Sequence, residues 1–236
     1  MGRLQPEMRS AHDELVQRGI PVSLFLHKNL VRGRVALDRQ TLVVGEIPSV
    51  ELALRRLDVE PPGEPGYPDA LRPFLLRKVW PSTMHEVRTA LDDARDGRFV
   101  KPRDRLKRFT GRVVDGLADL ASLHAVSASA PVWCAEVVSF VSEHRVFVID
   151  GAVVGTRCYD GDPSLRPSQI VVHEAIRAWT QTGAAAAGYG IDFGVLDDGR
   201  TALVEVNDGY GLGSYGLEDG AYLDLLMRRW QQLTMT

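Results

Sequence analysis

Asp192, Glu205 and Asn207 are the residues whose types and spacing best suit a chemical role. Directly opposite residues on antiparallel strands point to the same face, with Cβ atoms about 4.5–5.5 Å apart, and residues two apart on one strand share a face. A hairpin that pairs Asp192 with Glu205 would therefore gather two carboxylates and an amide. Like charges placed opposite each other repel, and Mg²⁺, which prefers one or two carboxylates with substrate phosphates, would neutralise them.

The surrounding sequence predicts such a hairpin. Alternating apolar segments at 190–196 and 201–207 flank Asp198-Gly199, and Asp-Gly is a strong signal for a tight turn. With a two-residue turn, Asp197 pairs with Arg200, and counting back places residue 192 opposite residue 205. The alternate positions should form the apolar face: Ile191, Phe193, Val195, Val204 and Val206. The alternative is a solvated acidic face, with a register slip separating the acids.

A basic stretch, RFVKPRDRLKRFTG, is the second candidate. Residues 99–101 predict a strand with a partner at 109–114, which places Lys101 at a strand end as a mobile charge suited to phosphate. Backbone amides near Gly111 could add donors. A solvated basic turn is the alternative, and contact with nucleic acid is disfavoured because no aromatic residues interleave the charges.

The other elements would position these residues. Thr83 and Glu86 form a capping-box pattern that predicts a helix from Met84 to Arg95. Asp150-Gly151 predicts a second hairpin between segments 137–149 and 152–158. The remaining predictions are strands at 22–26, 42–44 and 74–79, helices at 50–57, 116–124 and 168–182, and an irregular Pro- and Gly-rich segment at 59–68.

Composition is that of an ordinary globular protein. The 236 residues include 44% hydrophobic and 25% charged side chains, with a net charge of −3, so no overall basic excess indicates nucleic-acid binding. No apolar stretch approaches the roughly 20 residues that a membrane span needs, and no signal-peptide core is present. Cys134 and Cys158 are expected as unpaired thiols. These features favour the cytoplasm.

Three segments together resemble the ATP-grasp ligases, over roughly residues 74–222. They are the FVKP strand, the EVVSFVSEHRVFV strand and the IDFGVLDDGRTALVEVNDGYG end, and the nearest resemblance is to a divergent bacterial and phage group. The resemblance implies an α/β fold of the α+β type, with two antiparallel-sheet subdomains that sandwich ATP. It also implies an abbreviated α/β region at 1–68 and an ATP-grasp domain at 69–236, divided into a lysine-bearing part at 80–132 and a metal-binding part at 133–236.

The resemblance assigns roles residue by residue. Asp192, Glu205 and Asn207 would hold Mg²⁺, or Mn²⁺, between the phosphates. The nucleotide-binding residues would be Lys78, Lys101, Lys107, Glu136, Val137, Val138, Ser139 and Glu143, with Arg77 as an alternative to Lys78. Arg145, Arg157 and Lys107 would act on the transferring phosphate, although a cross-strand salt bridge is an equal reading of Arg145. An arginine that some classical ligases carry two positions before the first metal acid is Gly190 here, so its role would pass to Arg157 or another residue.

The activity implied is Mg-ATP-dependent joining of a carboxylate to an amine through an acyl phosphate. The acceptors would be a small molecule, a peptide or a protein, with neither nucleic acid nor membrane as a partner, and a homodimer stays open. The glycine-rich segment Asp208 to Gly220 would face the acceptor. Two alternatives remain: an assembly chaperone that binds ATP without forming an amide, and a phosphotransferase that acts on a hydroxyl.

Overall fold

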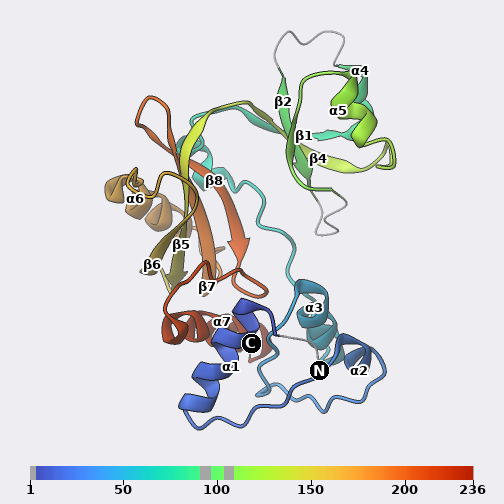
Figure 1. Ribbon diagram of the computed structural model, residues 1–236, viewed down its shortest axis with the longest axis vertical. Helices are drawn as coiled ribbons and strands as arrows, with labels where there is room; N and C mark the ends of the chain where they lie inside the picture. The colour runs from blue at the N-terminus through green and yellow to red at the C-terminus, as the bar shows by residue number, and fades with distance from the viewer. Residues whose placement is uncertain (1–3, 91–96, 104–108, 236) are drawn as a thin grey trace.

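The chain folds into an α+β structure built around two four-stranded antiparallel sheets (Figure 1). The computed structural model describes residues 4–90, 97–103 and 109–235. One sheet lies at the top of the view in Figure 1 and the other at its centre, with the N-terminal helices below. The expectation of an α+β fold with two antiparallel sheets is confirmed.

The first sheet is small and has its own core. Its strands run in the order β1-β4-β2-β3, with β1 at Val79–Thr83, β2 at Arg98–Pro102, β3 at Arg112–Val114 and β4 at Pro131–Glu136. Helices α4 (Met84–Thr89) and α5 (Leu117–Ser122) accompany it (Figure 1). A core that includes Met84, Val100, Val114 and Leu123 is fully buried.

The second sheet has longer strands and is more completely covered. It runs β6-β5-β7-β8, with β5 at Phe140–Ile149, β6 at Ala152–Gly161, β7 at Gly188–Leu196 and β8 at Thr201–Asp208. Helix α6 (Gln169–Thr180) and the 3₁₀ helix η1 (Asp69–Phe74) pack against it through apolar residues such as Trp179 and Leu71. The Asp150-Gly151 hairpin forms as predicted, with both turn residues at positive φ.

The N-terminal region is helical and docks on the C-terminal helix. Its helices are α1 (Pro6–Gln17), α2 (His27–Val31) and α3 (Ile47–Arg56), and α1 packs on α7 (Asp219–Thr234). Arg18 holds Asp224 at 2.5 Å. The strands predicted at 22–26 and 42–44 are wrong. Residues 42–44 run as extended chain whose side chains fill cores beside α3 and α7, with no neighbouring described strand to complete a ladder.

The strand predicted at 74–79 is also wrong. Phe74 ends η1, Leu76 takes a positive φ of 51°, and β1 starts only at Val79. Pro81 lies inside β1 instead of stopping it, which is possible because β1 is an edge strand. The capping box of Thr83 and Glu86 is confirmed, although α4 is described only to Thr89. Cys134 and Cys158 are unpaired, as expected.

The β7–β8 hairpin reaches its predicted pairing by a different route. Leu196 N–H donates to Arg200 O at 2.8 Å, so the turn holds three residues and Asp197 does not pair with Arg200. Farther along, Phe193 pairs with Leu203 but Asp192 pairs with Glu205, which leaves Val204 as the extra residue of a β-bulge. The longer turn shifts the register by one residue and the bulge restores it. Leu203, not Val204, therefore occupies the apolar face.

Candidate functional site

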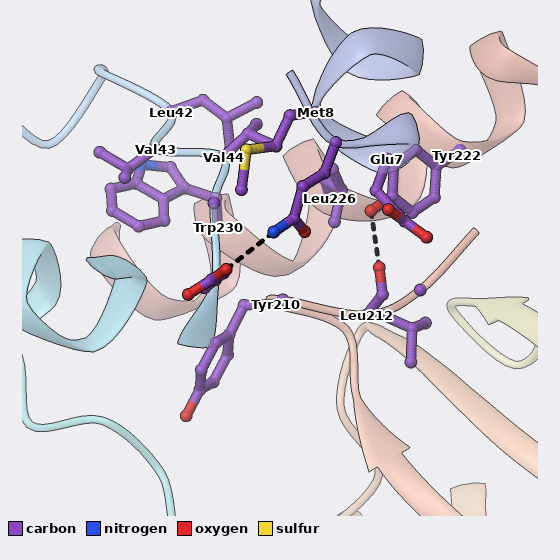
Figure 2. Close-up of a pocket in the computed structure, with 15 residues that line it drawn as sticks. Glu7, Met8, Leu42, Val43, Val44, Tyr210, Leu212, Tyr222, Leu226 and Trp230 are labelled. Atoms are coloured by element: carbon purple, nitrogen blue, oxygen red, sulfur yellow. Dashed lines mark hydrogen bonds between the residues drawn. The ribbon is translucent and has the colours of Figure 1, made fainter. Parts of the chain in front are cut away.

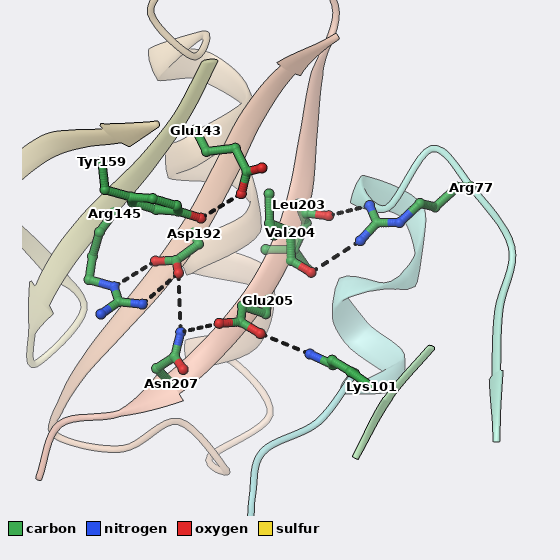
Figure 3. Close-up of polar contacts among 10 residues, drawn as sticks. All are labelled: Arg77, Lys101, Glu143, Arg145, Tyr159, Asp192, Leu203, Val204, Glu205 and Asn207. Atoms are coloured by element: carbon green, nitrogen blue, oxygen red, sulfur yellow. Dashed lines mark hydrogen bonds and ion pairs between the residues drawn. The ribbon is translucent and has the colours of Figure 1, made fainter. Parts of the chain in front are cut away.

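Asp192, Glu205 and Asn207 converge on one face of the second sheet (Figure 3). The Asn207 amide nitrogen donates to Asp192 Oδ2 at 3.2 Å and to Glu205 Oε1 at 3.1 Å. The amide thus lies between two carboxylates that would otherwise repel each other. The expected geometry of the three side chains is present, and the bulge at Val204 produces it.

Arg145 neutralises Asp192 from the neighbouring strand. Arg145 on β5 is the register partner of Asp192 on β7, and its Nε and Nη2 donate to the two carboxylate oxygens at 2.8 and 2.7 Å. Both side chains are buried, at 8% and 1% exposure. Burial raises the pKa of Asp192 to about 6 even though Arg145 opposes the shift. The cross-strand salt bridge considered for Arg145 does form.

Lys101 neutralises Glu205 from the other sheet. Lys101 on β2 donates to Glu205 Oε2 at 2.9 Å, and its ammonium lies 4.5 Å from the centre of the Tyr67 ring. Burial disfavours the charged form of Glu205, but Lys101 outweighs burial and holds the pKa of that carboxyl below its ordinary value. This ion pair joins the two sheets at the candidate site.

Gly190 makes room for Arg145. A Cβ built at Gly190 would lie 3.1 Å from Arg145 Cδ and 3.1 Å from Leu212 Cδ1, so a side chain there would collide with the guanidinium arm. Arg145 therefore occupies the space over position 190. Arg157 is directed elsewhere, because its Nε donates to Gly216 O at 2.8 Å in the glycine-rich segment.

Two connected cavities lie beside these ion pairs. The aromatic cavity, of about 440 Å³, is lined by Tyr67, Phe99, Phe140 and Tyr159 together with Arg77, Glu136, Val137, Val138 and Glu143. The central cavity, of about 420 Å³, is lined by Arg103, Arg145, Asn207 and the segment Tyr210 to Gly213 among others. Lys101, Thr110, Gly111 and Glu205 line both cavities. One elongated ligand could therefore extend along both cavities and past the carboxylates.

The donor set suits a hard divalent cation. Within the described ranges no group of three His, Cys, Asp or Glu side chains is arranged to hold a metal. Two carboxylates and an amide oxygen are nevertheless the kind of partial ligand set that Mg²⁺ uses when water and phosphate complete its shell. Asp192, Glu205 and Asn207 therefore fit such an ion.

Residues 74–225, more than half of the chain, match the model of an ATP-grasp domain family, described as family 2 of its clade. The chain belongs to this ATP-grasp family. Members of the ATP-grasp family are ATP-dependent carboxylate–amine ligases. The expected family is confirmed, and the substrate of this ATP-grasp protein is not identified by the match.

Solved structures agree on the fold. D-alanine–D-alanine ligase from Bacillus anthracis aligns at a TM-score of 0.56 and 14% identity, covering 100% of this chain and 97% of that ligase. The ligase PsnB, solved with a minimal precursor, Mg and ADP, gives 0.47 and 20% identity over 68% of this chain and 56% of PsnB. The macrocyclase MdnC from Microcystis aeruginosa, bound to the precursor peptide MdnA, gives 0.48 and 15% identity over 70% and 57%.

This chain spans only about half the length of PsnB, 56% by that alignment. None of the curated proteins compared with the chain matches it. No helix in the described part of the chain is long and apolar enough to cross a membrane.

Several predicted ATP-site residues are gathered and others are not. Glu136, Val137, Val138 and Glu143 line the aromatic cavity of the ATP-grasp domain, whereas Ser139 does not. Lys78 is 85% exposed and lies 3.7 Å from Glu136 Oε1, on no cavity wall. Lys107 lies outside the described residues.

Arg77 takes the place expected for Lys78. It lines the aromatic cavity, and its guanidinium donates to Leu203 O at 2.7 Å and Val204 O at 3.1 Å (Figure 3). These are the carbonyls on either side of the Val204 bulge. The alternative weighed for Lys78 is therefore the better fit to the geometry.

The aromatic lining was missed from the sequence. Tyr159 donates its hydroxyl proton to Glu143 Oε2 at 2.7 Å, and its ring stacks on Tyr215 with centroids 5.2 Å apart. Pairing passes from His144–Cys158 to Glu143–Asp160, so Tyr159 is the extra residue of a second bulge. Strict alternation along the strand gives no signal for such a residue. His144, expected on an exposed position, is buried with Nε2 2.8 Å from Leu165 O.

Proposed function

We propose that the chain is a Mg-ATP-dependent ligase that joins a carboxylate to an amine through an acyl-phosphate intermediate. The observation that carries the proposal is the convergence of Asp192, Glu205 and Asn207 where the aromatic and central cavities meet. Carboxylates at that point suit a metal-bound phosphate chain, with a base on one side and an acceptor on the other.

The aromatic cavity would hold the nucleoside. Tyr67 and Phe140 offer apolar surfaces for a base, and the backbone at Val137 and Val138 lines the same cavity. Glu143 would accept the ribose hydroxyls, held in place by the Tyr159 hydroxyl at 2.7 Å. The nucleoside end thus combines stacking surfaces with one positioned carboxylate.

The central cavity would hold the phosphates and the acceptor. Lys101, Arg103 and Arg145 bring three cations to its wall. Bound Mg²⁺ would neutralise charge that builds up on the transferring phosphate. Arg145, fixed by Asp192 and set in the space over Gly190, would stabilise the same charge in place of the arginine that position 190 lacks. The protein contributes position and charge rather than a nucleophile.

Substitution of the metal-facing residues tests the proposal. Glu205→Gln and Asn207→Ala should each weaken Mg-ADP binding at least about tenfold, measured by calorimetry, because each removes a ligand or its charge. Lys101→Ala should weaken the binding of ADP itself by a similar factor of roughly ten, through lost phosphate contact. Glu174→Gln, on the exposed side of α6, is the matched control.

Unchanged Mg-ADP affinity in both Glu205→Gln and Asn207→Ala, with folded proteins, would remove the metal assignment. Product analysis then separates the activities. A ligase releases ADP and phosphate only when both acceptors are present, whereas a phosphotransferase leaves phosphate on the acceptor. Nucleotide binding without turnover across an acceptor panel would favour an assembly chaperone.

A further inference from the structure

A third cavity lies between the N-terminal region and the C-terminal helix (Figure 2). This N-terminal cavity encloses about 200 Å³. Most of its wall is apolar or aromatic and comes from α1, the extended segment at 42–46, the glycine-rich segment and α7: Met8, Leu42, Val44, Leu212, Leu226, Tyr222 and Trp230. It is smaller than the roughly 300–1,000 Å³ of drug-sized sites, which suits a ligand about as large as one amino acid.

The charged groups on this wall have one sign. Glu7 and Glu46 line the cavity, and none of the described residues that line it is Lys, Arg or His. Glu7 is half-buried on α1, and its Oε1 lies 3.8 Å from the place a Cβ would take on Gly213. Glu46 accepts from Gln5 Nε2 at 2.8 Å, a neutral donor. The central cavity, by contrast, carries Lys101, Arg103 and Arg145.

The glycine-rich segment is a wall common to both cavities. Tyr210, Gly211, Leu212 and Gly213 line the N-terminal cavity and the central cavity alike. Gly211 has a φ of +67°, and a Cβ there would lie 2.7 Å from Ile47 Cγ1, so only glycine lets the segment pass this close to the N-terminal region. A ligand beside Glu7 would touch the same four residues that face the phosphate end.

We propose that the N-terminal cavity binds the amine acceptor, a primary amine with a single apolar side chain, with its ammonium group at Glu7. The role as acceptor rests on the proposed ligase function, whereas the binding does not. A half-buried carboxylate at the edge of an apolar cavity attracts a cation and penalises an anion, while the apolar wall favours a hydrocarbon chain.

In the reaction, the amine nitrogen attacks the carbonyl carbon of the acyl phosphate. The C–N bond forms, the bond between that carbon and the phosphate oxygen breaks, and phosphate leaves with the electron pair. Of the two protons that the ammonium nitrogen loses, one goes to the departing phosphate and the other to water. Glu7 positions the amine and takes no part in the bond changes.

The experiment uses three probes of one shape on the full chain, without nucleotide. These are 3-methylbutan-1-amine, 3-methylbutan-1-ol and 3-methylbutanoate, with binding measured by ligand-detected NMR. The amine should bind and the carboxylate should not. Glu7→Gln should weaken amine binding about tenfold or more, because it removes a charge-assisted hydrogen bond. Asp13→Asn, on the same helix and 61% exposed, should leave it unchanged.

Val44→Trp, which fills the cavity and keeps Glu7, should also block the amine. The proposal is overturned if the alcohol or the carboxylate binds as tightly as the amine, if none of the probes binds, or if Glu7→Gln binds the amine like the wild type. Mg-ADP affinity, measured in parallel, should be unchanged in Glu7→Gln. If the wild type fails to bind Mg-ADP, the ligase proposal fails while the amine result stands on its own.

Discussion

The two ion pairs of the site are built in different ways. Arg145 and Asp192 belong to adjacent strands of one sheet, are register partners, and are 8% and 1% exposed. Lys101 and Glu205 belong to different sheets and are 17% and 33% exposed. The first pair is fixed by strand register, whereas the second depends on how the two sheets meet.

This difference indicates a division of labour. A buried bidentate pair holds Asp192 and Arg145 in one geometry before any ligand arrives, which is what preorganised charge stabilisation needs. The pair between sheets can be exchanged, because a phosphate could replace Glu205 as the partner of Lys101 while a metal replaces Lys101 as the partner of Glu205. The within-sheet pair should therefore govern stability, and the pair between sheets should govern ligand binding.

The largest effect is expected for Arg145→Met. Removal of the guanidinium leaves Asp192 buried without its bidentate partner, which should lower the free energy of unfolding by about 3–5 kcal/mol. Urea unfolding monitored by circular dichroism measures it. Arg157→Met is the matched control, because Arg157 is the register neighbour on β6 and bonds only to carbonyls. Equal, small losses in the two variants would contradict the comparison.

A second test uses pH on the two carboxylates. The pKa of Asp192 is raised from 3.8 to about 6, so between these values the folded protein binds more protons than the unfolded chain, and stability falls as pH rises. Relative to wild type, Asp192→Asn should gain up to roughly 3 kcal/mol of unfolding free energy from pH 4 to pH 7. Glu205 has a lowered pKa, so Glu205→Gln should change in the opposite direction, losing relative stability as pH rises.

Unfolding free energies of the three proteins at pH 4, 5.5 and 7 would measure both slopes. Asp192→Asn should lose Mg-ADP binding even where it is the more stable protein, as expected for a residue kept for function at a cost in stability. Parallel curves for the wild type and both variants would show that neither carboxylate has a shifted pKa.

The site could be predicted further than its geometry could. Asp192, Glu205 and Asn207 follow from alternation and an Asp-Gly turn, yet their pairing was right only because a longer turn and the Val204 bulge compensate. Bulges depend on what each strand packs against, so sequence periodicity does not reveal them. Likewise, the apolar run at 22–26 looks like a strand locally, but no strand in the described ranges pairs with it.

The second bulge gives the smallest and most local test. Tyr159→Phe removes the hydroxyl that donates to Glu143 but keeps the ring stacked on Tyr215, so it should lower the free energy of unfolding by only about 1 kcal/mol. Mg-ADP affinity should fall by a factor of roughly five, because Glu143 loses the contact that orients it toward the ribose.

Tyr215→Phe is the control, since no hydrogen bond within the described residues involves its hydroxyl, and both quantities should stay at their wild-type values. Adenine binding separates the roles further, because adenine lacks the ribose and should bind the wild type and Tyr159→Phe equally. A loss of adenine affinity in Tyr159→Phe would instead mean that Tyr159 shapes the base end of the cavity, and that Glu143 is not positioned for the ribose.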